Sequence, residues 1–206
     1  MNGAERVWSI VVPVKPTAIG KSRLEVPGVD RRDLARAIAL DTIAAAARAR
    51  RVAEVIVVTD DPDVRAELAI ADRGTEAAPV RAVADPGGGL NDALAAGLEA
   101  AIGTARAVLL GDLPALRPAD LDDALRQATR PAVVADADGT GTTLFAHAET
   151  GLLRFGPGSY ARHLAAGAAA LDLDPASTLR RDVDTASQLA AARALGLGPH
   201  TAALLA

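Results

Sequence analysis

The chain has 206 residues, half of them hydrophobic, and a formal net charge of −4 that reflects 26 acidic and 22 basic side chains. We expect one domain covering residues 1–206, and the acidic balance argues against binding DNA or RNA, whose phosphates usually require a basic face. Cysteine is absent, which excludes disulfides and thiolate metal sites, and no apolar run approaches the ~18 residues of a membrane span, so we expect a soluble, cytoplasmic protein.

Short runs rich in β-branched residues alternate with alanine-rich stretches of helical period, which predicts an α/β fold with a largely parallel sheet. In chain order, strands are predicted at Ser9–Val14, Val55–Val58, Arg81–Ala84, Ala107–Leu110, Ala132–Ala135 and Thr142–Phe145, followed by an extended piece at Leu171–Leu173. Helices are predicted at Arg31–Arg50, from Pro62 onward, at Leu90–Ala101 and Pro118–Thr129, after Ser159, and at Ala186–Leu195. Ligands normally bind at the carboxyl ends of the strands in such a sheet, so we look for functional residues in those loops.

The loop after the first predicted strand contains both lysines of the protein, Lys15 and Lys21, and also Arg23. Lysine offers a compact, mobile charge and arginine a planar fork, so together they suit a polyphosphate group. The alternative is a solvated basic loop without a ligand. The segment Gly20–Ser22 resembles the end of a P-loop, but Lys15 stands where that motif requires glycine, so we reject a P-loop.

Acidic residues follow the fourth predicted strand and precede the last predicted helix. Asp112 lies directly after the strand, and Asp182 and Asp184 belong to an Asp-Val-Asp-Thr segment before the helix. Mg²⁺ prefers oxygen ligands and often takes only one or two protein carboxylates. We therefore expect Asp112 in a magnesium site, with one aspartate of the later segment beside it and the other as a cap. From the residues alone, Asp184 is explained equally well as a helix N-cap.

Two further aspartates, Asp60 and Asp61, follow the second predicted strand. Pro62 comes directly after them, which favours helix capping over a role in ligand binding. These residues also leave a different class of function open, a non-catalytic α/β sensor or receiver-like module in which Asp60, Asp61 and Asp112 form an acidic pocket. Such a pocket has no need of the paired lysines in the first loop.

Six segments in chain order carry a resemblance that runs over nearly the whole sequence. They are Pro13–Leu24, Gly89–Asn91, Gly111–Pro114, Gly139–Thr142, Phe155–Ser159 with Arg162 and His163, and Asp182–Thr185. In these segments the chain resembles the CofC/FbiD guanylyltransferases of deazaflavin coenzyme F-420 biosynthesis, which belong to the MobA-like nucleotidyltransferase superfamily. The resemblance implies a single-domain, three-layer α/β/α nucleotidyltransferase fold.

The resemblance also implies an activity, the transfer of GMP from GTP to phosphoenolpyruvate, which gives enolpyruvoyl-2-diphospho-5'-guanosine and pyrophosphate. It places Mg²⁺ on Asp112 and Asp184, and the acceptor acid on Thr142, Gly156 and Ser159. The alternative acceptors are 2-phospho-L-lactate and 3-phosphoglycerate. Without the resemblance, the turn before Thr142 would be interpreted as a hairpin turn and Ser159 as an N-cap.

The nucleotide is expected on the basic loop. Lys15, Lys21 and Arg23 would bind GTP and, together with Asp112 as catalytic residues, stabilise the departing pyrophosphate. Gly89 is a candidate contact to guanine or ribose, although a glycine turn before a helix would have the same sequence.

Two further side chains have expected roles. Asn91 is a second candidate contact to guanine or ribose. His163, one helical turn after Ser159, is expected to be neutral and packed or hydrogen-bonded rather than a catalytic base. The expected partners are GTP and a small phosphorylated carboxylic acid, with no nucleic acid and no membrane, and the sequence leaves open whether the chain forms a homodimer.

Overall fold

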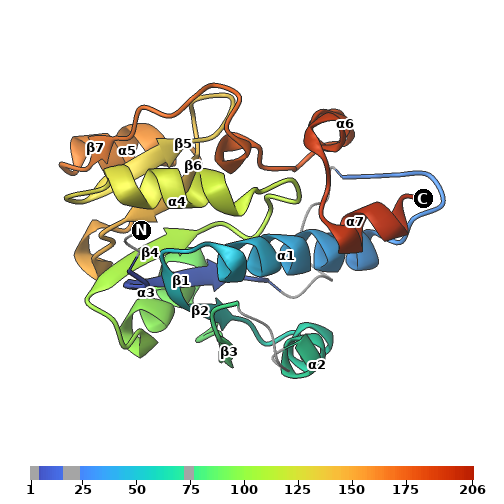
Figure 1. The fold of residues 1–206 in the computed structure, drawn as a ribbon, viewed down its shortest axis with the longest axis horizontal. Coiled ribbons are helices and arrows are strands. Elements are labelled where there is room, and N and C mark those ends of the chain that lie inside the picture. Colours follow the sequence, from blue (N-terminus) through green and yellow to red (C-terminus); the bar gives the residue numbers. More distant parts are fainter. Residues whose placement is uncertain (1–4, 16–23, 72–76) are drawn as a thin grey trace.

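A seven-stranded sheet with the order β3-β2-β1-β4-β6-β5-β7 lies at the centre of the computed structural model, which describes residues 5–15, 24–71 and 77–206 (Figure 1). β6 runs antiparallel to both of its neighbours, and the other strand pairs are parallel. The mostly parallel sheet predicted from the sequence is therefore confirmed. The strands are β1 (Trp8–Pro13), β2 (Val52–Val58), β3 (Val80–Val83), β4 (Ala105–Leu109), β5 (Ala132–Ala135), β6 (Thr142–Ala146) and β7 (Ala169–Ala170).

Helices cover both faces of this sheet, which gives the three layers that the resemblance implied. One face carries α1 (Arg31–Arg48), α2 (Pro62–Ala71) and α4 (Pro118–Gln127), and the other carries α3 (Leu90–Ala100) and α5 (Ser159–Ala165). The remaining elements are the short 3-10 helices η1 (Thr150–Leu152) and η2 (Thr178–Arg180) and the C-terminal helices α6 (Ala186–Leu195) and α7 (Pro199–Leu204). Within the described ranges, none of the helices combines the length and the apolar sequence needed to cross a bilayer.

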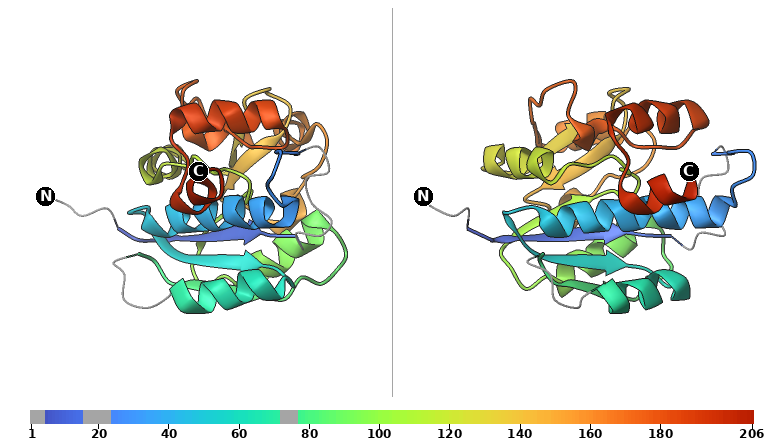
Figure 2. Two further views of the ribbon diagram at one scale, coloured as in Figure 1. Left: turned by 90° about the vertical axis from the view of Figure 1, so that its right-hand side faces the viewer. Right: turned by 45° about the vertical axis from the view of Figure 1, so that its right-hand side comes forward.

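Alternating residues of β1 pack against the helical layers on the two faces of the sheet. Ile10 and Val12 pack in the core cluster that contains α1 and α4, whereas Val11 packs in the cluster that contains α3, as the period of two in a strand requires. All three side chains are fully buried. A third, smaller cluster joins α6 and α7 to the first half of α1, and Figure 2 shows α7 lying along α1.

The topology brings several loops to one edge of the sheet, here called the carboxyl edge. β1 lies between β2 and β4, so the strand order reverses at β1, and ligands bind at such switch points in open α/β sheets. The ends of β1 and β4 lie close together: a Cβ added to Gly111 would be 3.0 Å from the Pro13 carbonyl oxygen. Because β6 is antiparallel to β4, its first residue, Thr142, lies at this same edge.

Most predicted elements are present, with boundaries that differ by a few residues, but two C-terminal features differ. The extended piece expected at Leu171–Leu173 forms its ladder at Ala169–Ala170, where it pairs with β5. Helix α7 was not predicted. Its first amide groups, those of His200 and Thr201, donate to the Asp41 carboxylate at 2.9 and 2.8 Å. A cap supplied from a distant helix leaves no signal in the local sequence.

Gly97 allows α3 to lie close against the sheet. A Cβ at this position would come within 2.3 Å of Val11 Cγ1 and 2.8 Å of Val58 Cγ2. We expect Gly97→Ala to lower the free energy of unfolding by about 1–3 kcal/mol, because overpacking forces core side chains or backbone to move. Urea denaturation measures this. Gly151→Ala is the matched control, since a Cβ there meets nothing within 4 Å, and equal stability losses in both variants would contradict the packing argument.

Candidate active site

Three aspartates from two distant segments meet at the carboxyl edge. Asp112 follows β4, and Asp182 and Asp184 lie between η2 and α6. The amide of Val183 donates to the Asp112 carbonyl at 3.0 Å, which fixes the two segments side by side. One carboxylate oxygen from each aspartate lies within 4.8 Å of the others. Val183 itself is fully buried, so the aspartates on either side of it can share the opposite side of this extended segment.

The electrostatics of this cluster favour a bound cation. The pKa of Asp182 is raised to about 7, mainly by burial and in addition by the negative charges of Asp112, Asp136 and Asp184. Carboxylates that repel one another in this way can ionise together once a cation neutralises them. The donor set consists of carboxylate oxygens, which suits a hard divalent ion such as Mg²⁺ rather than a metal that prefers thiolate or imidazole.

The structure brings together the two aspartates predicted as metal ligands, and it adds a third. Thr185, not Asp184, caps α6, because the Thr185 hydroxyl accepts from the Gln188 amide at 3.3 Å. The expectation that Asp182 or Asp184 acts as the cap was therefore wrong, and Asp182 was missed as a member of the cluster. The Asp-Val-Asp pattern could have indicated it, since alternate residues of an extended segment point the same way.

The other aspartates considered in the sequence do not join this cluster. Asp61 Oδ1 accepts from the amides of Asp63 and Val64 at 3.0 and 3.2 Å, which confirms that Asp61 caps α2. Among the described residues, the one set of three or more acidic, His or Cys side chains close enough to share an ion is Asp112, Asp182 and Asp184, which includes neither Asp60 nor Asp61. The acidic pocket proposed for a sensor or receiver-like module is therefore not formed.

The basic loop begins at the same switch point. Lys15 follows β1 and is exposed, in the loop next to the one that carries Asp112. Lys21 and Arg23 lie outside the described residues, so their predicted roles remain predictions. Lys15 and Asp112 thus lie in loops that leave adjacent parallel strands, β1 and β4.

The turn before Thr142 is built around the Asp136 side chain. Its carboxylate accepts from the amides of Thr140 at 2.8 Å and Gly141 at 2.6 Å. Arg180, just before the aspartate pair, donates to the carbonyls of Ala135 and Asp136. These hydrogen bonds define the conformation of the turn, and Asp136 lies close enough to the acidic cluster for its charge to raise the pKa of Asp182.

The segment that leads into α5 lies against this turn. The amide of Tyr160 donates to the Thr140 carbonyl at 3.2 Å, and Thr142 Oγ1 lies 3.0 Å from His163 Nδ1. Ser159 is buried and is the first residue of α5, whose N-cap is Gly158. The interpretation of Ser159 as an N-cap, which its sequence alone would suggest, is therefore wrong. Gly156 has a φ of +123°, a value that favours glycine. The three predicted acceptor residues, Thr142, Gly156 and Ser159, therefore belong to two segments in direct contact.

His163 is fully buried and neutral, as predicted. Burial is the main cause that lowers its pKa from 6.5 to about 4, and the positive charges of Arg162 and Arg154 act in the same direction. Its ring packs against Phe145 and Phe155, with centroid distances of 4.9 and 4.8 Å. These surroundings give His163 a structural role between the segments that carry the predicted acceptor residues.

The two residues predicted to contact guanine or ribose lie at the start of α3. Gly89 has a φ of +107° and precedes the helix as its N-cap. Asn91 forms two hydrogen bonds with the backbone of Phe155: Nδ2 donates to the carbonyl at 3.1 Å and Oδ1 accepts from the amide at 2.9 Å. Asn91 thus joins the start of α3 to the segment that precedes Gly156.

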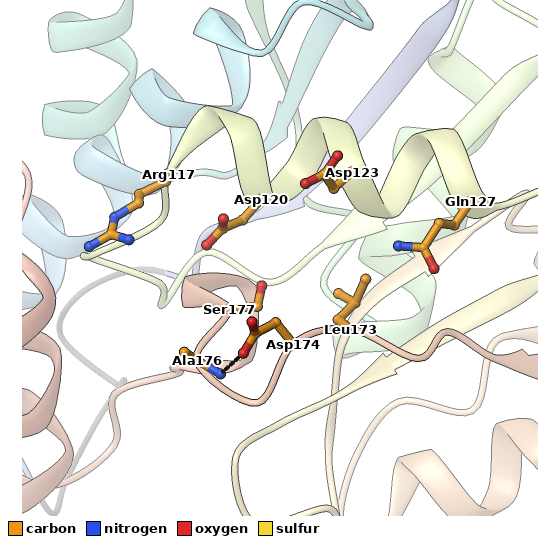
Figure 3. Close-up of a pocket in the computed structure, with 8 residues that line it drawn as sticks. All are labelled: Arg117, Asp120, Asp123, Gln127, Leu173, Asp174, Ala176 and Ser177. Carbon is orange, nitrogen blue, oxygen red and sulfur yellow. Dashed lines mark hydrogen bonds between the residues drawn. The ribbon is translucent and has the colours of Figure 1, made fainter.

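A separate small pocket of about 200 Å³ lies between α4 and the segment before η2 (Figure 3). One of its three acidic residues, Asp120, accepts from the amide and hydroxyl of Thr178 at 2.7 and 2.6 Å. None of the predicted site residues lines it. We interpret Asp120 as a structural anchor that fixes η2, and hence the start of the segment that carries Asp182.

Comparison with known proteins identifies the family of this chain. The family described as "Guanylyl transferase CofC like" matches residues 8–191. The chain belongs to this family. It is 50% identical over 216 aligned residues to a phosphoenolpyruvate guanylyltransferase of Thermomonospora curvata, with 100% of this chain and 91% of that protein covered. It is also 47% identical to the protein of the same name from Streptomyces scabiei, with 97% of this chain and 96% of that protein covered.

Solved structures of similar fold include a nucleotidyl transferase. A nucleotidyl transferase from Methanothermobacter thermautotroptrophicus superposes with a TM-score of 0.60 at 22% identity, covering 92% of this chain and 97% of that chain. CMP:2-keto-3-deoxy-manno-octonic acid synthetase in complex with CTP superposes with a TM-score of 0.58 at 18% identity, covering 92% and 98%. These likenesses establish the nucleotidyltransferase fold that the sequence resemblance implied.

Proposed function

We propose that this guanylyl transferase joins the GMP unit of GTP to phosphoenolpyruvate and releases pyrophosphate, in the cytoplasm and with Mg²⁺ as the metal. The observation that carries the proposal is the cluster of Asp112, Asp182 and Asp184 at the switch point of the sheet. It lies in a chain that is half identical, over its full length, to a phosphoenolpyruvate guanylyltransferase. A fold neighbour from Mycobacterium tuberculosis, with a TM-score of 0.53, was solved in complex with manganese, which is consistent with a divalent ion.

The proposed reaction needs little acid-base chemistry from the protein. A phosphate monoester has a second pKa of about 6, so at neutral pH its oxygen can attack without first giving a proton to a side chain. That oxygen forms a bond to the α-phosphorus of GTP, and the bond between the α-phosphorus and the bridging oxygen of pyrophosphate breaks. A bound Mg²⁺ would neutralise phosphate charge and thereby reduce the repulsion between the two anionic substrates.

The protein's own residues would then bind, orient and stabilise charge. Asp112, Asp182 and Asp184 would hold the ion. Lys15, Lys21 and Arg23 would bind the triphosphate and stabilise the negative charge that develops on pyrophosphate. Buried His163 is too weak a base for the reaction at neutral pH, so catalysis would rest on positioning and electrostatics.

The acceptor would lie on the two contacting segments described above. In our proposal Thr142, Gly156 and Ser159 bind the phosphate and carboxylate of the acid, through backbone amides and the serine hydroxyl. Gly156 is suited to this because a residue without Cβ lets an anion approach the backbone closely. Gly89 remains a proposed contact to the guanine or ribose.

A substrate panel tests this function. Purified protein with Mg²⁺ is incubated with each nucleoside triphosphate and with phosphoenolpyruvate, 2-phospho-L-lactate or 3-phosphoglycerate, and both pyrophosphate release and product mass are measured. We expect release with GTP and phosphoenolpyruvate only. If the protein prefers another acid, the proposed acceptor is wrong but the proposed transfer of GMP stands. If no combination of nucleotide and acid releases pyrophosphate, the proposed function is refuted.

Removing the Lys15 charge should impair the use of GTP. We expect Lys15→Ala to lower kcat/KM for GTP by about 10–100-fold, the usual effect of losing one hydrogen bond to a charged group. Steady-state kinetics at saturating acid measures this. Arg126→Ala removes a positive charge from the exposed face of α4, outside the proposed site, and serves as the control. Equal effects of the two substitutions would indicate that Lys15 lies in a solvated basic loop that does not bind GTP.

A further inference from the structure

Two side chains hold the backbone immediately before Gly156. Asn91 from α3 forms two hydrogen bonds with the Phe155 backbone, at 3.1 and 2.9 Å. His163 from α5 accepts from the Arg154 amide through Nε2 at 3.0 Å. Arg154 and Phe155 are thus fixed by elements that lie far apart in the sequence. The segment carries no regular secondary structure of its own here, so its conformation depends on these side chains.

The hydrogen bonds also define which nitrogen of His163 carries the hydrogen. An amide N–H can only donate, so Nε2 is the unprotonated nitrogen, and the neutral ring carries its hydrogen on Nδ1. Nδ1 lies 3.0 Å from Thr142 Oγ1, so the threonine oxygen accepts this bond. The hydroxyl hydrogen of Thr142 is consequently directed away from His163. One buried ring therefore sets the conformation of residue 154 and the orientation of the Thr142 hydroxyl at once.

We propose that Asn91 and His163 are positioning residues that shape the acceptor site, and that Asn91 acts on the acid rather than on the nucleotide. The inference rests on the proposed function, which places the acid on Thr142, Gly156 and Ser159. Asn91 holds the residue before Gly156, and His163 joins Thr142 to the segment that leads to Gly156 and Ser159. Loss of either side chain should therefore weaken binding of the acid while the metal and the triphosphate still bind.

The test combines kinetics with hydrogen exchange. Asn91→Leu removes both bonds to Phe155 at similar side-chain volume. We expect its KM for phosphoenolpyruvate to rise about tenfold, as expected for a lost hydrogen bond, and its KM for GTP to stay within about twofold. Exchange of the Arg154 and Phe155 amides should become faster. A rise in the KM for GTP alone would overturn the proposal and make Asn91 a nucleotide contact, and faster exchange with both KM values unchanged would overturn it as well.

Two substitutions at His163 separate its two bonds. His163→Gln extends to the Nε2 position and keeps an acceptor for the Arg154 amide, whereas His163→Asn reaches only the Nδ1 position. We expect the glutamine variant to stay within about threefold of the wild-type KM for the acid and the asparagine variant to rise about tenfold. The reverse order, or an equal loss in both, would contradict a positioning role for Nε2.

A matched control removes polar contacts elsewhere in the fold. Glu54 accepts from Ser9 Oγ at 2.6 Å and from the Ile102 amide at 2.9 Å, near the starts of β1 and β2 and thus at the opposite edge of the sheet. Glu54→Ala should lower thermal stability without changing either KM, and a change in the KM for the acid would show that general destabilisation explains the Asn91 result.

Failure of the proposed function can be distinguished from failure of this inference. If the wild-type protein does not use phosphoenolpyruvate, the proposed acceptor is wrong, and the same variants are measured with the acid that the protein does use. No turnover with any acid overturns both proposals.

Discussion

Asp112→Asn is expected to reduce kcat by about 100-fold or more while the protein stays folded. Asn keeps the shape of the side chain but removes a charge from the site where Asp112, Asp182 and Asp184 lie within 4.8 Å. Loss of an outer-shell partner of a metal typically costs 10–100-fold in affinity or activity, and loss of a direct ligand should cost at least about as much. Asp112 lies in a loop at the carboxyl edge rather than in the core, so near-native stability is expected. Steady-state kinetics and circular dichroism measure the two quantities.

The same variant gives a readout that does not depend on turnover. Mg²⁺ should raise the melting temperature of the wild-type protein, because an ion that binds only the folded state stabilises it. The rise should be much smaller in Asp112→Asn. Asp172→Asn removes an exposed carboxylate after β7 and is the control for net charge. Wild-type turnover in Asp112→Asn, or an undiminished response to Mg²⁺, would remove Asp112 from the metal site.

His163 should make the protein less stable in acid. Burial, with the nearby Arg162 and Arg154 charges, lowers its pKa from 6.5 to about 4 in the folded state. Between these values the unfolded chain binds a proton that the folded protein does not, so stability falls as the pH falls through this window. The contribution of neutral His163 to the free energy of unfolding is complete above pH 6.5. About 3 kcal/mol of this contribution should be lost when the pH falls to 4.

A comparison of two proteins isolates this contribution. Unfolding free energies of the wild type and of His163→Phe are measured in urea from pH 7 to pH 4. Phenylalanine keeps an aromatic ring beside Phe145 and Phe155 but does not titrate, and all other titrating groups are common to both proteins. The wild type should therefore lose more stability than the variant over this range. Parallel curves would contradict a neutral, buried His163.

The sequence was most informative where one residue follows a strong strand. Asp112 could be assigned to the ligand-binding edge because β-branched residues predict the strand before it, and parallel strands share one carboxyl edge. The sheet and most helices could be predicted for the same reason. The prediction that Asp184 binds the metal depended on the resemblance to a family, because a carboxylate before a helix is explained equally well as a helix cap.

The features that could not be predicted depend on contacts between distant residues. Asp182 enters the acidic cluster because the Val183 amide bonds to the Asp112 carbonyl. Asn91 and Phe155 are 64 positions apart, and nothing in either local sequence indicates their hydrogen bonds. The antiparallel direction of β6 likewise follows from its pairing with β4 and β5, and it decides that Thr142 lies at the carboxyl edge.

The most direct test of the account is a crystal structure with Mn²⁺ and a non-hydrolysable GTP analogue, in which anomalous scattering locates the ion. We expect the ion bound by carboxylate oxygens of Asp112, Asp182 and Asp184 at about 2.0–2.3 Å, with a phosphate oxygen as a further ligand and Lys15 directed at the triphosphate. An ion bound elsewhere, or Asp112 turned away from it with the triphosphate remote from Lys15, would contradict the proposed active site.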